Sequence, residues 1–143
     1  MALFTVDTKV EALKHAPLFE DLSKDELDEL AKRTDDLDFP AGKVLVKEGE
    51  IGGEFYVIMN GEAEATREGQ SIATFGEGDF FGEVSLVQDV PRNATVTATT
   101  PIRCFVITRG RFLNLLDDQP AVERKVMRAL AKRLSSVSND PSL

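Results

Sequence analysis

The sequence predicts a mainly β fold flanked by helices. Between Asp38 and Thr108, short apolar runs separated by glycines recur at regular intervals, which is typical of a sandwich or barrel. Apolar residues recur at helical spacing on both sides of this region. A chain of 143 residues is long enough for one domain that buries about two-thirds of its unfolded surface.

Two helices are expected before the strands. Ser23 and Glu26 have the spacing of a capping box, and Leu27, Leu30 and Ala31 follow at helical intervals. We therefore expect an amphipathic helix over residues 23–33 and a shorter helix near residues 6–14.

Six strands are expected in the central region, at 43–47, 54–59, 62–67, 71–75, 93–98 and 103–108. Cys104 is the single cysteine and can form no internal disulfide, so it is expected to fill the core as a small apolar residue. The acidic cluster of Asp35, Asp36 and Asp38 is expected to form a solvated turn without a catalytic role.

Helical patterns return after Arg109. A short helix is expected over 111–116, and Pro120 is well suited to begin a longer helix that reaches about residue 137. The apolar stripe of this long helix is expected to dock on the barrel, and it comprises Val122, Val126, Met127, Leu130, Leu134 and Val137. Its basic face is expected to be solvated, and it comprises Arg124, Lys125, Arg128, Lys132 and Arg133. Residues 138–143 are expected to form a flexible tail.

Composition excludes several classes of function. A net charge of −8 argues against direct binding to nucleic acid, which depends on clustered lysines and arginines. No stretch approaches the ~20 apolar residues that span a bilayer, so a soluble, cytoplasmic protein without a membrane span is expected. No cysteine or histidine spacing fits a metal site, and His15 is expected at the surface.

The segment over residues 81–98, FGEVSLVQDVPRNATVTA, is the most informative for function. It places Glu83 nine residues before Arg92, on either side of a short turn. Unpaired amides at the start of a helical turn attract anions, and arginine can bind two phosphate oxygens at once. A carboxylate beside a phosphate is better suited to accept hydrogen bonds from sugar hydroxyls. Sugar and phosphate together indicate a nucleotide site.

The same segment strongly resembles the phosphate-binding cassette of the cyclic-nucleotide-binding domain family, F-G-E-[LIM]-[AS]-L followed by P-R-x-A-T-V. Residues 81–86 match its first half, and residues 91–96 match its second half with Asn93 at the variable position. The family includes regulatory subunits of cAMP-dependent protein kinase, catabolite activator proteins and nucleotide-gated channels. The resemblance covers roughly residues 6–137. It implies one such domain, folded as an eight-stranded jelly-roll-type β-roll (double-stranded β-helix) with N-terminal and C-terminal helices.

The resemblance also implies a role for each cassette residue. Glu83 would accept a hydrogen bond from the ribose 2′-OH, and Arg92 would pair with the cyclic phosphate. The cradle would be completed by the backbone amides of Gly82, Val84, Ser85 and Asn93. The positions that match the base pocket are Ala65, Val126, Met127 and Leu130.

The implied function is a non-catalytic receptor domain that binds a cyclic nucleotide and needs no cofactor, with the C-terminal helix moving as the switch. cAMP is the expected ligand because Ala65 and Val84 offer no dedicated guanine contacts. cGMP stays open because Asn93 departs from the alanine common in cAMP-selective domains and from the threonine common in cGMP-selective ones. A protein partner or a second copy would bind through the C-terminal helix.

Three alternatives follow from the same residues. Glu83 and Arg92 can form an ordinary ion pair that closes a loop. The domain can keep the fold yet act as a ligand-independent module for protein interaction or dimerisation, because the glycines also serve backbone geometry. A metal-dependent cupin enzyme has a related barrel, but its metal generally binds several histidines, whereas this chain has only His15, ahead of the barrel.

Overall fold

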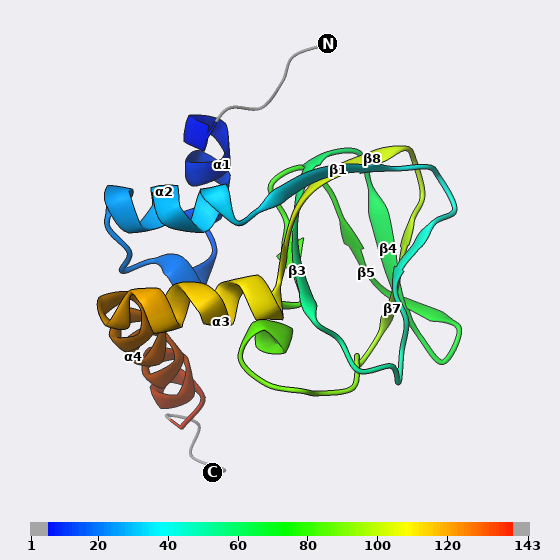
Figure 1. The fold of residues 1–143 in the computed structure, drawn as a ribbon. Coiled ribbons are helices and arrows are strands. Elements are labelled where there is room, and N and C mark those ends of the chain that lie inside the picture. The colour runs from blue at the N-terminus through cyan, green and yellow to red at the C-terminus, as the bar shows by residue number, and fades with distance from the viewer. Residues whose placement is uncertain (1–5, 139–143) are drawn as a thin grey trace.

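The structure, a computed structural model, describes residues 6–138, with side chains described for residues 8–132. Within these residues, eight strands form two four-stranded antiparallel sheets that enclose a roll, and the helices gather on one side of it (Figure 1). The sheet orders are β1-β8-β3-β6 and β2-β7-β4-β5. The predicted fold class, mainly β with flanking helices, is confirmed.

The strands are β1 (Asp35–Phe39), β2 (Val44–Val46), β3 (Glu54–Asn60), β4 (Ala63–Arg67), β5 (Gln70–Phe75), β6 (Phe80–Phe81), β7 (Thr95–Ala98) and β8 (Ile102–Thr108). The helices are α1 (Val6–Leu13), α2 (Lys24–Lys32), α3 (Arg109–Asp118) and α4 (Pro120–Ser138), with short 3₁₀ helices η1 (Pro17–Phe19) and η2 (Glu83–Leu86). All six predicted strands and all four predicted helices are present, with ends that differ by at most two residues. The expected tail begins within α4, and residues 139–143 lie outside the described part of the chain.

The sequence prediction missed two strands, β1 and β6. The turn expected at Asp35, Asp36 and Asp38 is wrong, because all three belong to β1 at the edge of a sheet, but Asp35 and Asp38 are exposed to solvent as expected. Arg103 on the neighbouring strand β8 donates to both carboxylate oxygens of Asp36 at 2.8 Å. These two parallel hydrogen bonds pair the Asp36 carboxylate within the sheet, so an acidic run can form an edge strand. β6 has only two residues, too few for a sequence pattern.

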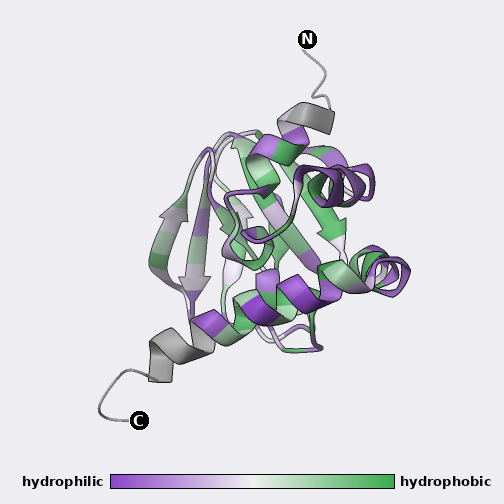
Figure 2. Cartoon of the chain, turned by 90° about the vertical axis from the view of Figure 1, so that its left-hand side faces the viewer, coloured by the Kyte–Doolittle hydropathy of each residue, from purple (hydrophilic) through white to green (hydrophobic). Residues whose placement is uncertain are grey.

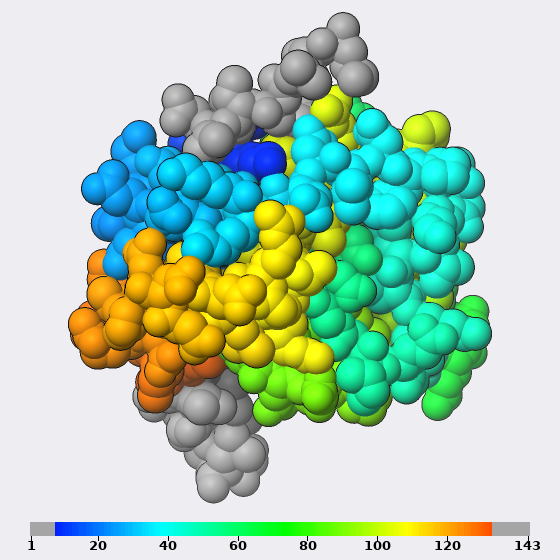
Figure 3. Space-filling model, viewed as in Figure 1, coloured from blue at the N-terminus to red at the C-terminus, as the bar shows by residue number. Residues whose placement is uncertain are grey.

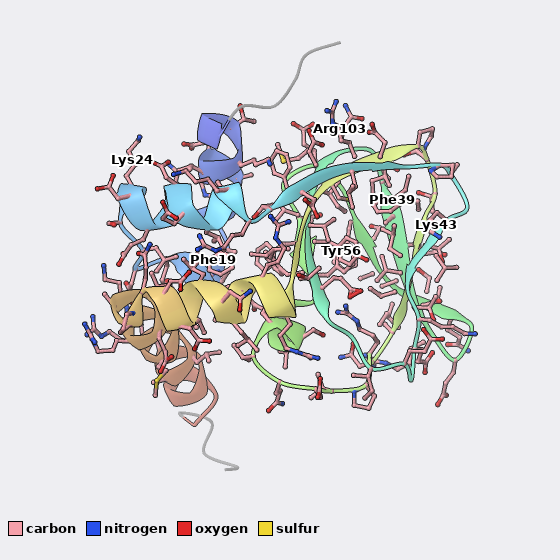
Figure 4. The ribbon with its side chains drawn as sticks, viewed as in Figure 1. Phe19, Lys24, Phe39, Lys43, Tyr56 and Arg103 are labelled. Carbon is pink, nitrogen blue, oxygen red and sulfur yellow. The ribbon has the colours of Figure 1, made fainter. Side chains whose placement is uncertain are left out.

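Strands β3 and β8 are buried on both faces, which explains their continuous apolar runs. On β3, Phe55 and Val57 belong to a core shared with the helices, whereas Tyr56 and Ile58 belong to the core inside the roll. Figure 4 shows Tyr56 within the roll and Phe19 among the helices. Cys104 lies in the inner core with 0% exposure, as predicted.

The helices are positioned by capping and by this shared core. Ser23 caps α2 through both bonds of the predicted capping box: its Oγ accepts from the Glu26 amide at 3.2 Å, and its amide donates to Glu26 Oε1 at 2.8 Å. α3 buries Phe112 and Leu115 in the same cluster as Phe55. In the space-filling view the α3 surface lies directly against the strands (Figure 3).

Helix α4 docks mainly on other helices, so its contact with the barrel is less direct than expected. It packs on α3 and η1, with Val122 and Val126 buried in the core that the helices share with β3 and β8. Hydrophilic and hydrophobic residues alternate along its length (Figure 2). The side chains of Arg133, Leu134 and Val137 lie outside the described residues.

The basic face of α4 is only partly solvated. Lys125 Nζ pairs with Glu26 Oε1 at 2.6 Å, and Lys132 Nζ lies 3.3 Å from Asp21 Oδ2. Arg124 and Arg128 are exposed. In the part of the chain with described structure, no helix combines the length and the apolar character needed to cross a membrane.

Candidate functional site

A cavity of about 560 Å³ opens between the 82–93 segment and strands β4 and β5. This volume is in the usual range for small-molecule sites. All six predicted cassette residues line it, namely Gly82, Glu83, Val84, Ser85, Arg92 and Asn93. The folding of β4 and β5 adds a second wall, which contains Ala65, Arg67, Ile72, Ala73 and Phe75.

Arg92 is a buried charged side chain in the wall of this cavity. Its side chain is only 8% exposed, and Nη2 donates to the carbonyl oxygen of Glu54 at 2.9 Å. The Glu54 carboxylate lies at the 4.0 Å limit of an ion pair. Burial lowers the pKa of Arg92, with Glu54 and Tyr56 opposing this shift. A bound anion would compensate this desolvated charge, and the guanidinium suits two phosphate oxygens.

Two glycines hold the guanidinium between them. A Cβ on Gly82 would lie 2.6 Å from Arg92 Nη1 and 2.6 Å from the Glu54 carbonyl oxygen. A Cβ on Gly52 would lie 2.1 Å from Arg92 Nε. Gly82 also has a φ of +88°, which starts η2 in a backbone conformation that side chains disfavour. Glycine is therefore required at Gly82 by conformation and at both positions by the close approach of Arg92.

The turn η2 presents one acid and buries one serine beside Arg92. Glu83 is 9% exposed and Ser85 is 2% exposed. The Ser85 amide, one of the four expected in the cradle, already donates to the Gly82 carbonyl oxygen at 3.1 Å. Val84 is 51% exposed and faces the cavity with an apolar side chain.

The other wall of the cavity combines apolar and aromatic groups. Phe81 stacks on Tyr56 at 4.8 Å between ring centroids and on Phe75 at 5.4 Å. The Tyr56 hydroxyl donates to the Leu45 carbonyl oxygen at 3.1 Å, and burial raises its pKa to about 12, so this group stays protonated. Such a wall fits a flat, weakly polar ring better than a second anion.

The structure brings only one of the four expected base-pocket residues to the cavity. Ala65 lines it and is 3% exposed. Val126 is buried in the core around α3, Leu130 packs on the same core, and Met127 is 61% exposed to solvent. None of the described side chains of α4 lines the cavity, because this helix packs on α3 and η1. These three residues therefore do not line the cavity in this structure, and their role in a base pocket stays a prediction.

Sequence reasoning missed three residues that shape the site. Gly52 and Glu54 hold Arg92, and Arg67 lines the cavity and donates from Nε to the Asn93 carbonyl oxygen at 2.8 Å. The adjacent pair Gly52-Gly53 before a strand was an available signal, since paired glycines permit close backbone approach. No local pattern could have indicated Arg67, which meets the cassette only through the pairing of β4 with β7.

A second cavity, of about 700 Å³, lies beside α1 and β3. Its lining includes Glu11, His15 and Glu77. Two carboxylates would repel a phosphate, so this cavity suits an anionic ligand less well. His15 is exposed, as expected.

Comparison with known proteins identifies the family of this chain. The model of the family described as cyclic nucleotide-binding domain matches residues 36–119, more than half of the chain. A cAMP-dependent protein kinase regulatory subunit from Yarrowia lipolytica is 41% identical over 106 residues, covering 73% of this chain and 28% of that protein. A CRP-like cAMP-activated global transcriptional regulator from Mycobacterium tuberculosis is 28% identical over 135 residues, covering 91% of this chain and 60% of that protein.

Among solved structures, the N-terminal domain of a transcriptional regulator from Streptomyces coelicolor A3(2) superposes with a TM-score of 0.83. The two sequences are 29% identical, and the superposition covers 90% of this chain and 96% of the bacterial domain. The chain thus spans little more than a quarter of the Yarrowia relative but nearly all of this bacterial domain. The sheets, the cassette and the family match lead to one conclusion: this chain belongs to the cyclic nucleotide-binding domain family.

Proposed function

We propose that residues 6–137 form a non-catalytic receptor domain that binds cAMP in the cavity beside η2. The observation that carries this proposal is the buried guanidinium of Arg92, held between Gly52 and Gly82 in the wall of that cavity. In the bound state the Arg92 guanidinium pairs with the cyclic phosphate, and the Glu83 carboxylate accepts a hydrogen bond from the ribose 2′-OH. The amides of Gly82, Val84 and Asn93 contribute to the cradle, with Ser85 as the buried support of the turn.

The choice of cAMP has two supports. First, the cavity wall against which a base would lie contains the apolar residues Ala65, Ile72 and Ala73. The relatives from Y. lipolytica and M. tuberculosis both carry cAMP in their names. Asn93 and Arg67 are the polar side chains that offer hydrogen bonds to a guanine, so side-by-side titration with cAMP and cGMP decides the ligand.

Titration calorimetry of Arg92→Leu tests the phosphate role. Removing one member of a desolvated charge pair commonly costs ~2–5 kcal/mol, so the affinity should fall roughly 30-fold to a few thousand-fold. Arg111→Leu is the matched control, because its side chain is 42% exposed and pairs with an exposed Asp35, an interaction worth ~0–1 kcal/mol. Equal affinities for Arg92→Leu and the unmodified chain would refute the role of Arg92.

A thermal-shift experiment separates the receptor from the ligand-independent alternative. A nucleotide at 100 times its dissociation constant stabilises the folded state by ~2.7 kcal/mol. A chain that shows no shift with either cAMP or cGMP at millimolar concentration would instead be a module for protein contact or dimerisation.

The switch in this proposal is the position of α4. Leu86 of η2 is fully buried in the same core as Phe112, Val122 and Val126, so a displaced turn disturbs the packing of both C-terminal helices. A nucleotide that binds one position of α4 better than another shifts the population between them. Equal hydrogen-exchange protection of residues 109–130 with and without saturating nucleotide would refute the switch.

The partner surface in this proposal is the exposed face of α4. Met127 is 61% exposed there and lies between Arg124 and Arg128, both also exposed. This face suits a second copy or an acidic protein partner. Sedimentation of the unmodified chain and of Met127→Glu measures whether a dimer forms through it.

A further inference from the structure

Arg109 is placed where the roll meets the C-terminal helices. It directly follows β8 and is the first residue of α3. Its Nη1 lies within hydrogen-bond distance of three carbonyl oxygens, those of Gly52 at 3.2 Å, Ser85 at 3.3 Å and Gln88 at 3.3 Å. One side chain thereby joins the loop before β3 to the turn η2 and the residues that follow it.

Two further contacts complete this junction. The Arg109 backbone amide donates to the Gly53 carbonyl oxygen at 2.7 Å. Its Nη2 forms an ion pair with Asp89, in the segment that leads from η2 to Arg92. The first residue of α3 is therefore bound, through main chain and side chain, both to the loop at Gly52 and Gly53 and to the cassette segment over residues 85–89.

The segments that Arg109 holds are the ones that position Arg92. A Cβ on Gly52 would lie 2.1 Å from Arg92 Nε and 2.6 Å from Ser85 Oγ, so Gly52 lies directly against Arg92, the proposed phosphate-binding residue, and Gly52 and Ser85 lie side by side. Arg109 contacts the carbonyl oxygens of these same two residues. A movement of η2 toward a bound phosphate must lengthen these hydrogen bonds or draw Arg109 with it.

Helix α3 packs directly against α4. Phe112 and Leu115 of α3 are fully buried in one cluster with Val122 and Val126 of α4. The two helices are separated by a single residue, Gln119. Close-packed interfaces of this kind shift between discrete arrangements rather than deform continuously.

We propose that Arg109 is the positioning residue that couples occupation of the cassette to the placement of α3 and α4. This inference rests on the proposed nucleotide binding and names the residue through which that binding reaches the helices. Arg109 itself touches no ligand. The Arg109 guanidinium makes directional hydrogen bonds to the loop before β3 and to the segment that includes η2. These bonds add to the non-directional apolar contact between Leu86 and the core that the helices share. A lysine would keep the charge but could not serve the carbonyls and Asp89 together.

The test combines calorimetry with hydrogen exchange on the whole 143-residue chain. Arg109→Met removes the donors and keeps an apolar stem, and Arg109→Lys is the milder variant if the first is unstable. Arg111→Met is the matched control on the same helix, since Arg111 contacts Asp35 and the Lys32 carbonyl oxygen and not the cassette. Each variant is measured without nucleotide and at cAMP saturation set by its own dissociation constant.

We expect Arg109→Met to bind cAMP with a loss of roughly tenfold or less, because Arg92 and Glu83 remain. The cAMP-dependent change in exchange over residues 110–130 should shrink by roughly twofold or more, whereas the Arg111→Met chain keeps it in full. A general loss of stability would raise exchange in both states equally and would leave the cAMP-dependent difference unchanged.

Three results would overturn the coupling role. They are a full cAMP-dependent change in both Arg109 variants, an equal reduction in Arg111→Met, or the absence of any such change in the unmodified chain that binds cAMP. Loss of all cAMP binding in folded Arg109→Lys would likewise place Arg109 in the binding site and refute the proposal. Failure of the unmodified chain to bind cAMP or cGMP is a separate result, which refutes the proposed function.

Discussion

Gly52→Ala tests whether the placement of Arg92 controls binding, without removing any charge. The added Cβ would lie 2.1 Å from Arg92 Nε, 2.4 Å from Cζ and 2.6 Å from Ser85 Oγ. The φ of Gly52 lies outside the left-handed region, so alanine introduces no backbone strain. A Cβ on Gly82 would also lie 2.6 Å from Arg92 Nη1, so the guanidinium fits closely against both glycines, and we expect the added methyl group to displace it from the geometry that binds phosphate.

Overpacking of this kind typically costs about 1–3 kcal/mol. In the nucleotide-free protein, displacement of Arg92 relieves part of this overpacking free energy. In the bound state Arg92 must occupy its phosphate-binding position, so the full cost applies. We therefore expect the affinity for cAMP to fall by roughly 5- to 150-fold. The free energy of unfolding of the nucleotide-free protein should fall by less than the binding free energy does.

The neighbouring Gly53 supplies the control for this experiment. Its φ is also outside the left-handed region, and an added Cβ would meet no atom within 4 Å. Gly53→Ala should change stability by about 0.5 kcal/mol or less and leave the affinity within about threefold. Calorimetric titration with cAMP and urea unfolding of both variants measure the two quantities. Wild-type affinity in Gly52→Ala, or an equal loss in Gly53→Ala, would refute the steric argument.

Three further predictions concern stability and reactivity. Gly61→Ala forces a side chain into a φ of +97° and places its Cβ 2.4 Å from the Pro101 carbonyl oxygen, so urea unfolding should show a loss of ~2–4 kcal/mol. Gly69→Ala has a φ of +80° but open space, and should lose only about 1 kcal/mol. Burial would raise the pKa of Glu26, but hydrogen bonds from Lys125 and Ser23 hold it below 4.5. A lowered folded-state pKa adds stability above the unfolded-state value, which is lost as the pH falls through the lowered pKa. Unfolding should therefore show Glu26→Gln to be about 1 kcal/mol less stable than wild type at neutral pH, with the difference lost as the pH falls through the lowered pKa of Glu26. A difference that does not shrink on acidification would contradict the assignment. Burial raises the pKa of Cys104 to about 12, so a thiol reagent should label it only after unfolding, and rapid labelling of the native chain would show that the inner core opens.

Local sequence patterns predicted much of this fold because the interactions behind them are local. The Ser23 and Glu26 capping box joins residues three apart, and it is present with both bonds. Pro120 is the first residue of α4. The amide N–H at this position has no hydrogen-bond partner within a helix, so a proline, which has no N–H, loses nothing there. In contrast, β1 is stabilised by Arg103, 67 residues from Asp36, and no window of sequence contains both.

The same distinction applies to the candidate site. The cassette residues from Gly82 to Asn93 are close in sequence, so their grouping at one cavity was predictable from spacing and resemblance. The α4 residues were less predictable, because an apolar residue at helical spacing fits a core as well as it fits a ligand. Only packing on α3 and η1 determines that Val126 is buried among helices and that Met127 faces solvent.

The sequence by itself determined the family, the four helices, six of the eight strands, and the acid and arginine that the proposed ligand requires, because these depend mainly on residues close to one another in the chain. Tertiary structure alone decided which glycine confines Arg92, which carbonyls Arg109 joins, and where α4 rests. These contacts connect segments dozens of residues apart, and the chain brings them together only when β3 and β8 pair between the two cores.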